Sequence, residues 1–94
     1  MTEIHLKVCR PDVSMEAQME HVGLELEEAV AALARYRNKA TGKNRAEVLF
    51  ELLDVMNAAQ TAIYMEFNEE EIREGVNYTN AKSFVRQYQL PEDD

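Results

Sequence analysis

Apolar residues recur at every third or fourth position along most of the chain, the spacing that predicts amphipathic helices. The first such stretch runs from Met15 to Asn38 and follows Ser14, a candidate N-cap. Gly23 lies inside this stretch and marks a place where the helix can bend or divide. We expect one apolar stripe of this helix to face a core, and it comprises Met19, Val22, Leu26, Ala29, Val30 and Leu33.

Two further helical stretches follow a basic loop at residues 39–45. The second stretch runs from about Ala46 to Phe67, and the third begins after the candidate N-cap Asn68 and ends near Tyr88. Because the connection is short, the first two helices are expected to be antiparallel neighbours. The expected buried stripe of the second helix comprises Leu49, Leu52, Val55, Met56, Ala59 and Ile63.

The first 13 residues lack the helical period. Ile4, Leu6 and Val8 alternate with polar residues, which suits an edge strand, an extended arm or the first turns of a helix. We therefore predict a single all-α domain over residues 1–94, an antiparallel helical bundle with an N-terminal arm at 1–13 and a frayed tail at 89–94. A chain of this length buries only about 60% of its unfolded surface. Assembly as a homodimer or homotetramer is therefore expected.

The charge balance narrows the classes of partner. The 94 residues include 10 Lys and Arg against 18 Asp and Glu, a formal net charge of −8. This balance argues against nucleic acid and anionic membranes as partners, because both require clustered basic residues. The sequence has no apolar run near the roughly 20 residues of a membrane span and no recognisable signal peptide. With the single Cys9 interpreted as an ordinary thiol, a cytoplasmic location is expected.

Two acidic pairs on successive helices carry the candidate chemistry. Glu25 and Glu28 are three residues apart, as are Glu51 and Asp54, so each pair lies on one helical face. Four converging carboxylates would repel one another unless a cation neutralised them. Oxygen ligands of this kind favour Mg²⁺, with Mn²⁺ as a substitute. The plain alternative is that these acids are solvated surface residues.

The pattern E-x-x-E followed by E-x-x-D resembles the signature of the MazG-like all-α nucleoside triphosphate pyrophosphohydrolases. The resemblance implies hydrolysis of a (d)NTP between the α and β phosphates, giving a monophosphate and pyrophosphate. It also implies metal binding by Glu25, Glu28, Glu51 and Asp54. Either Glu25 or Glu28 would then be the catalytic residue that orients or deprotonates the attacking water. The preferred base and sugar are not indicated.

Five further residues are candidates for substrate binding. Asn80, Lys82 and Arg86 resemble the Asn-plus-basic segment with which such enzymes contact phosphates or base. Asn57 follows Asp54 by three residues and His21 precedes Glu25 by one turn, so both are expected near the acids. Each of these residues also has an ordinary surface or structural interpretation. Two other functions stay open, a non-catalytic helical interaction protein and an inactive nucleotide-binding homologue.

Overall fold

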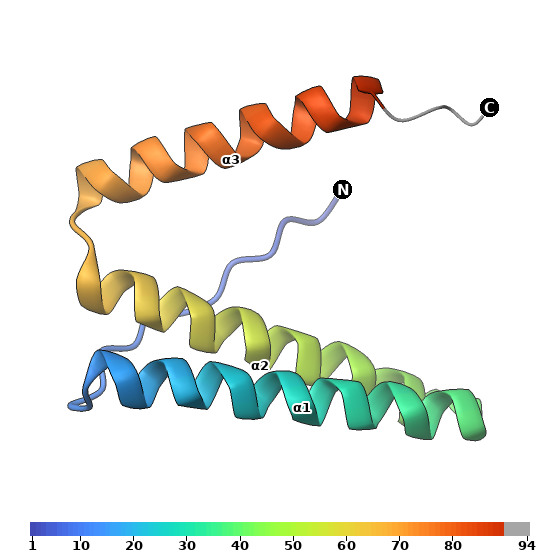
Figure 1. Cartoon of the computed structure of the whole chain (residues 1–94). Coiled ribbons are helices and arrows are strands. Elements are labelled where there is room, and N and C mark those ends of the chain that lie inside the picture. The colour runs from blue at the N-terminus through green and yellow to red at the C-terminus, as the bar shows by residue number, and fades with distance from the viewer. Residues whose placement is uncertain (90–94) are drawn as a thin grey trace.

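The computed structural model describes residues 1–89, with side chains described as far as Ser83, and it is all-helical (Figure 1). Helix α1 spans Met15–Asn38, α2 spans Gly42–Glu66 and α3 spans Glu69–Gln89. Within these residues there is no strand, so the alternating residues 4–8 belong to an extended arm without a sheet partner. Of the tail expected at 89–94, residues 90–94 lie outside the described residues.

Helix α1 begins where its cap predicts. The Ser14 hydroxyl accepts a hydrogen bond from the backbone N–H of Ala17 at 3.0 Å, which satisfies one of the free N–H groups of the first turn. The helix does not divide at Gly23, and α1 is continuous to Asn38. Glycine adopts helical dihedral angles freely, so its cost in a helix is entropic and does not by itself interrupt the hydrogen-bond ladder.

Helix α2 begins at Gly42, four residues before the predicted start, so the basic loop shrinks to residues 39–41. The reason is a second cap, because the Thr41 hydroxyl accepts a hydrogen bond from the N–H of Asn44 at 3.1 Å. The first turn that this cap stabilises is polar, and the apolar period therefore gives no sign of it.

Helix α3 starts with a reciprocal capping box. The Asn68 side chain accepts from the N–H of Glu71 at 2.8 Å, and the Glu71 carboxylate accepts from the N–H of Asn68 at 2.9 Å. The predicted N-cap at Asn68 is therefore confirmed. Only Phe67 and Asn68 separate α2 from α3.

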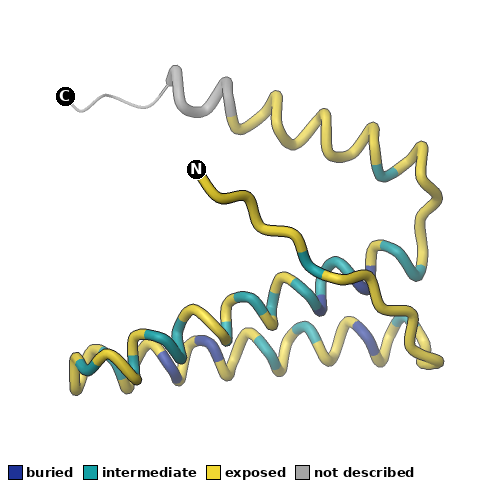
Figure 2. Tube along the Cα trace, turned by 180° about the vertical axis from the view of Figure 1, so that it is seen from behind, coloured by how far each residue is buried: buried dark blue, intermediate teal, exposed yellow. Residues whose placement is uncertain are grey.

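Helices α1 and α2 form an antiparallel hairpin that packs through small residues (Figures 1 and 2). We call this contact the alanine seam, and its buried apolar residues are Ala29, Ala32, Ala58 and Ala62. Alanine lets two helices approach closely but leaves longer side chains beside the contact instead of inside it. No large side chain is fully buried among the described residues.

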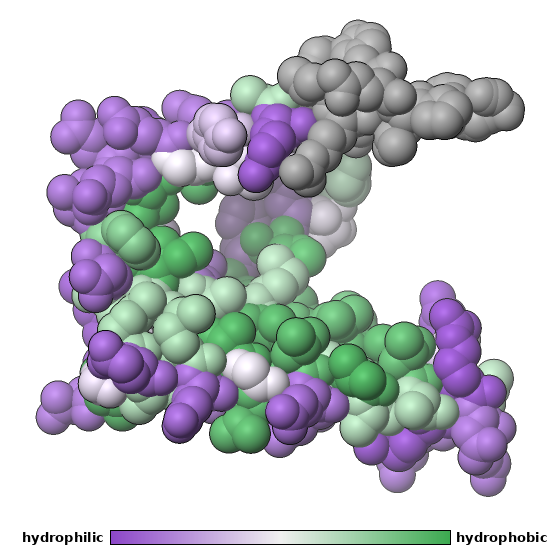
Figure 3. All heavy atoms as spheres, in the orientation of Figure 1, coloured by the Kyte–Doolittle hydropathy of each residue, from purple (hydrophilic) through white to green (hydrophobic). Residues whose placement is uncertain are grey.

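The two predicted core stripes are therefore only partly correct for the single chain, because Ala29 is their one buried member. Most of the other members flank the alanine seam and are exposed, and Figure 3 shows hydrophobic residues gathered along the hairpin on the side toward α3. Val22, Val55 and Ala59 are half-buried. The exposed members of the stripes are Met19, Leu26, Val30, Leu33, Leu49, Leu52, Met56 and Ile63.

Helix α3 stands away from the hairpin (Figure 1). Among the described residues, α1 against α2 is the one extensive helix contact. The radius of gyration is 16.2 Å, whereas a compact domain of this length has about 12 Å. The all-α class is confirmed, but one chain does not close its three helices into a bundle.

Candidate functional site

Three of the four predicted metal ligands converge beside the alanine seam. Glu25 and Glu28 on α1 and Glu51 on α2 each place a carboxylate oxygen within 4.8 Å of the other two. Glu25 and Glu51 are half-buried and Glu28 is exposed. We call these three residues the acidic cluster.

The alanine seam explains why the acidic cluster forms. Glu25 precedes the buried Ala29 by four residues, and Glu51 precedes the buried Ala58 by seven. Residues at these spacings share a helical face, so the turn that carries each carboxylate is directed toward the opposite helix. Close approach at the alanines then brings the carboxylates of the two helices together.

Two carboxylate oxygens of the acidic cluster are buried without a hydrogen-bond partner, namely Oε1 of Glu25 and Oε1 of Glu51. Buried polar atoms are nearly always hydrogen-bonded in folded proteins, so these two oxygens are free to accept a ligand. The second oxygen of Glu25 lies 3.4 Å from Nε2 of His21, one turn earlier on α1. The predicted position of His21 next to Glu25 is confirmed by this contact.

The electrostatics of the acidic cluster are unfavourable to its ionised form. Burial raises the pKa of the Glu25 carboxyl, the neighbouring charge of Glu28 raises this pKa further, and His21 opposes the change. Burial likewise raises the pKa of Glu51, reinforced by Glu28 and Asp54 and opposed by Arg35. Like charges accumulate here without enough positive charge nearby to balance them.

The donor set fits a hard divalent cation. Oxygens bound to one Mg²⁺ at about 2.1 Å lie at most about 4.2 Å apart, and Ca²⁺ allows slightly more. The spacing of up to 4.8 Å in the acidic cluster therefore needs only a small side-chain movement to bind such an ion. A cation at this position would contact the two oxygens that lack partners and would offset the repulsion.

The fourth predicted ligand, Asp54, is exposed and lies outside the 4.8 Å set. Its negative charge nevertheless raises the pKa values of both Glu25 and Glu51, so it is a close neighbour of the acidic cluster. Asp54 also lines a pocket of about 480 Å³ that opens beside the acidic cluster, which we call the acidic pocket. Its other lining residues are Cys9, Pro11, Val13, Ala17, Gln18, His21, Glu25, Asn57, Ala58 and Thr61.

Asn57 reaches the acidic pocket, as its spacing from Asp54 predicts. Its side-chain oxygen Oδ1 is buried and has no hydrogen-bond partner. An amide oxygen in this state accepts a hydrogen bond readily, because leaving it unsatisfied costs about 1–3 kcal/mol. Asn57 is therefore placed to contact a molecule in the acidic pocket.

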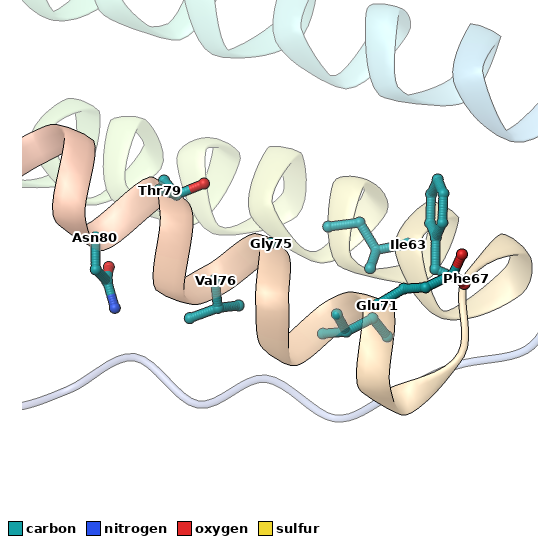
Figure 4. A pocket seen from close by; sticks show the side chains of 8 residues that line it. Ile63, Phe67, Glu71, Gly75, Val76, Thr79 and Asn80 are labelled. Atoms are coloured by element: carbon teal, nitrogen blue, oxygen red, sulfur yellow. The ribbon is translucent and has the colours of Figure 1, made fainter.

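The predicted substrate residues on α3 lie elsewhere. Asn80 lines a separate, largely apolar groove of about 490 Å³ between the end of α2 and α3 (Figure 4). The ammonium of Lys82 lies 5.3 Å from the ring centroid of Tyr78 on the same helix. The side chain of Arg86 lies outside the described residues. The structure thus does not bring Asn80 and Lys82 to the acidic cluster within one chain.

Sequence reasoning gave no functional role to two parts of the acidic pocket. Gln18 is 5% exposed, and its side-chain amide donates to the backbone oxygen of Ala58 at 3.0 Å, which ties α1 to α2. The spacing of seven residues from Gln18 to Glu25 and from Glu25 to Ala32 was a usable signal, since it places all three on one face of the helix. The arm residues 9–13 gave no such signal, because no local pattern shows where an extended segment will pack.

Comparisons with known proteins provide no relative. No protein-family model matches the chain, and neither the curated proteins nor the solved structures contain a match. Over the part of the chain that the structure describes, no helix combines the length and apolar character needed to cross a bilayer.

Proposed function

We propose that this protein is a Mg²⁺-dependent nucleoside triphosphate pyrophosphohydrolase of the MazG-like type. The observation that supports the proposal is the convergence of Glu25, Glu28 and Glu51 from two helices, with two buried oxygens that lack partners. Acids that were merely solvated would point into water and would satisfy their oxygens there. The E-x-x-E and E-x-x-D spacings support the same assignment.

The reaction adds water across the bond between the α and β phosphates. Bound Mg²⁺ would supply positive charge to the phosphate oxygens and so admit a triphosphate to a negatively charged site. Glu25, Glu28, Glu51 and Asp54 would hold the ion. Glu28 is the exposed member of the acidic cluster and can accept a proton from the attacking water. The oxygen of this water forms the new bond to the α-phosphorus. Pyrophosphate leaves with the electrons of the broken bond.

The acidic pocket offers contacts for the rest of the nucleotide. Asn57 presents its free amide oxygen to an N–H or O–H donor on the base or sugar. His21, when protonated, would contribute a positive charge beside Glu25. Asn80, Lys82 and Arg86 on α3 would reach a substrate only if α3 came from a second copy of the chain or moved onto the hairpin.

The decisive experiment measures pyrophosphate release from each (d)NTP with Mg²⁺, with Mn²⁺ and with excess chelator. We expect one or a few triphosphates to be hydrolysed in a metal-dependent way. Glu51→Gln should reduce kcat by at least about a hundredfold, because loss of even an outer partner of a metal ligand costs 10- to 100-fold. Glu20→Gln is the matched control, since Glu20 is an exposed acid of α1 that does not line the acidic pocket.

The same experiment separates the competing functions. Metal-dependent thermal stabilisation and nucleotide binding without turnover would identify an inactive nucleotide-binding homologue. The absence of hydrolysis, of binding and of any effect of Mg²⁺ on thermal stability would leave the non-catalytic interaction protein.

We further propose that the protein self-associates, as a homodimer or homotetramer. The exposed stripes of α1 and α2 support this, because Val30 is 61% exposed and Leu26 is 52% exposed in a chain with no fully buried large side chain. Large contiguous apolar surface is typical of subunit interfaces. Packing two hairpins face to face would complete a four-helix bundle with these residues inside.

A further inference from the structure

The N-terminal arm, residues 1–13, is fixed to the hairpin at two points. At its C-terminal end, Ser14 caps α1. The second point lies eight residues before Ser14, at Leu6. The side-chain amide of Gln60 on α2 donates to the backbone oxygen of Leu6 at 3.0 Å and approaches that of Lys7 at 3.4 Å. The arm crosses the C-terminal half of α2 as a result (Figure 2).

The segment between these two points borders the acidic pocket. Cys9, Pro11 and Val13 line it together with His21 and Glu25 from α1. On the other side of the arm, Arg10 lines a hollow at the junction of α2 and α3. The arm therefore separates two hollows, and it supplies a face of the acidic pocket that neither α1 nor α2 provides.

We propose that residues 9–13 form the outer wall of the nucleotide pocket beside the acidic cluster, and that Gln60 is the positioning residue that holds this wall in place. The ligand part of this inference rests on the proposed function, and the anchoring of the arm does not. With the arm anchored, the pocket is bounded on three sides, by α1, by α2 and by the arm.

The composition of this wall indicates what it contacts. Pro11 and Val13 are apolar and Pro11 has a restricted φ angle, so together they present a preformed surface at little entropic cost. The carboxylates of Glu25 and Asp54 line the same pocket, and the metal-bound phosphates of a nucleotide would lie beside them. The arm is thus suited to pack against the base or sugar of the nucleotide and to distinguish nucleotides by size and shape.

A pair of substitutions at Gln60 tests the anchoring. Gln60→Met keeps the length of the side chain but removes the N–H donor, whereas Gln60→Lys restores a donor of similar reach. Trypsin cleaves after Lys7 in the arm and cleaves poorly between Arg10 and Pro11, so mass spectrometry of the Lys7 cut reports whether the arm is held. We expect Gln60→Met to speed this cleavage at least threefold and Gln60→Lys to stay near the wild-type rate.

The kinetics of the full-length protein test the wall. For the triphosphate that is hydrolysed fastest, Gln60→Met should raise KM at least threefold with kcat within twofold of wild type, because Gln60 does not touch the reacting atoms. The same triphosphate with Mg²⁺ should slow cleavage after Lys7 in the wild-type protein.

Each result has a separate meaning. An unchanged Lys7 cleavage rate in Gln60→Met overturns the anchoring role, whatever the enzyme activity. Faster cleavage with an unchanged KM overturns the wall. If no triphosphate binds or reacts while Gln60→Met still frees the arm, the proposed function and the wall both fail and the anchoring alone stands.

Discussion

The carboxyl group of Glu51 is half-buried, has an unpartnered oxygen and lies near three negatively charged residues, Glu28, Asp54 and Glu47. Without metal its ionised form opposes folding, so Glu51→Gln should raise the melting temperature measured in chelator. If the proposed site binds Mg²⁺, the ion should raise the melting temperature of the wild-type protein by mass action, and the same substitution should abolish this increase. Circular dichroism melts with and without Mg²⁺ measure both effects.

Glu20→Gln provides the comparison for these melts, since it removes one exposed charge from the same helix. It should leave the Mg²⁺ response intact. A wild-type protein whose melting temperature ignores Mg²⁺, together with a Glu51→Gln variant that is less stable in chelator, would show that Glu51 has a structural role.

The raised pKa values of Glu25 and Glu51 predict how metal-free stability changes with pH. A carboxyl whose pKa is higher in the folded state binds more protons folded than unfolded, so folding is favoured as pH falls through the folded-state pKa. We expect the metal-free protein to become more stable as the pH falls from 7.5 to about 5. The lower limit of this range stays above the ordinary carboxyl pKa of about 4.3. Urea denaturation in chelator across this range measures the slope.

Saturating Mg²⁺ should reverse that slope, because an ion at the proposed metal site would bind the ionised carboxylates and compete with protons. The double variant Glu25→Gln with Glu51→Gln should flatten the metal-free slope. A slope that survives in the double variant would assign the pH dependence to other groups.

At the residue scale, the sequence was sufficient to select Glu25, Glu28 and Glu51, because helical spacing places them on converging faces. It was also sufficient for the caps at Ser14 and Asn68, whose signals are local. The hydrogen bond from Gln60 to the arm was not predictable, since it joins residues 54 positions apart and has no periodic signature.

The element scale is dominated by the alanine seam. Ala32 is completely buried between α1 and α2, whereas its neighbour Ala31 is exposed. Ala32→Leu should therefore force the helices apart and destabilise the hairpin by about 1–3 kcal/mol, the usual cost of overpacking. Ala31→Leu is the same substitution at an exposed position next to Ala32, and it should alter the free energy of unfolding by less than about 0.5 kcal/mol. Urea denaturation of both variants compares them directly.

Mg²⁺ binding offers a second measurement that compares the Ala32→Leu and Ala31→Leu variants. If the seam sets the distance between the carboxylates, Ala32→Leu should also weaken Mg²⁺ binding in titration calorimetry, and Ala31→Leu should not. Equal stability of the two variants would mean that the helices do not depend on close contact at Ala32.

Periodicity correctly predicted that helices exist and approximately where they lie, but it misidentified their buried faces. Large apolar residues were assigned to the core because they bury the most surface when buried. In the single chain the two helices meet through alanines instead, and the large residues remain available for another partner. Residue hydrophobicity indicates that a face becomes buried, and it does not indicate whether the partner is the same chain or another.

At the scale of the whole molecule, the open apolar face predicts concentration-dependent assembly. Met56 is one of the exposed apolar residues of α2, with 44% of its surface exposed. Met56→Lys should place a charge in the subunit interface and weaken association at least tenfold, whereas Glu27→Lys on the exposed side of α1 should not. Sedimentation velocity over a range of concentrations measures the difference. A wild-type protein that stays monomeric at all concentrations would contradict the proposed self-association.

The methyl groups of Ala29 and Ala58 set the separation of the two helices beside the acidic cluster, although neither residue offers a ligand atom. The gap between the two backbones at the seam determines how far the carboxylates must reach, and hence the radius of the ion that the proposed metal site would enclose. The two alanine methyl groups would then control whether the proposed metal site prefers Mg²⁺ or the larger Ca²⁺. Exchanging one of them for a bulkier residue would then change the ion selectivity of the proposed metal site without altering any ligand.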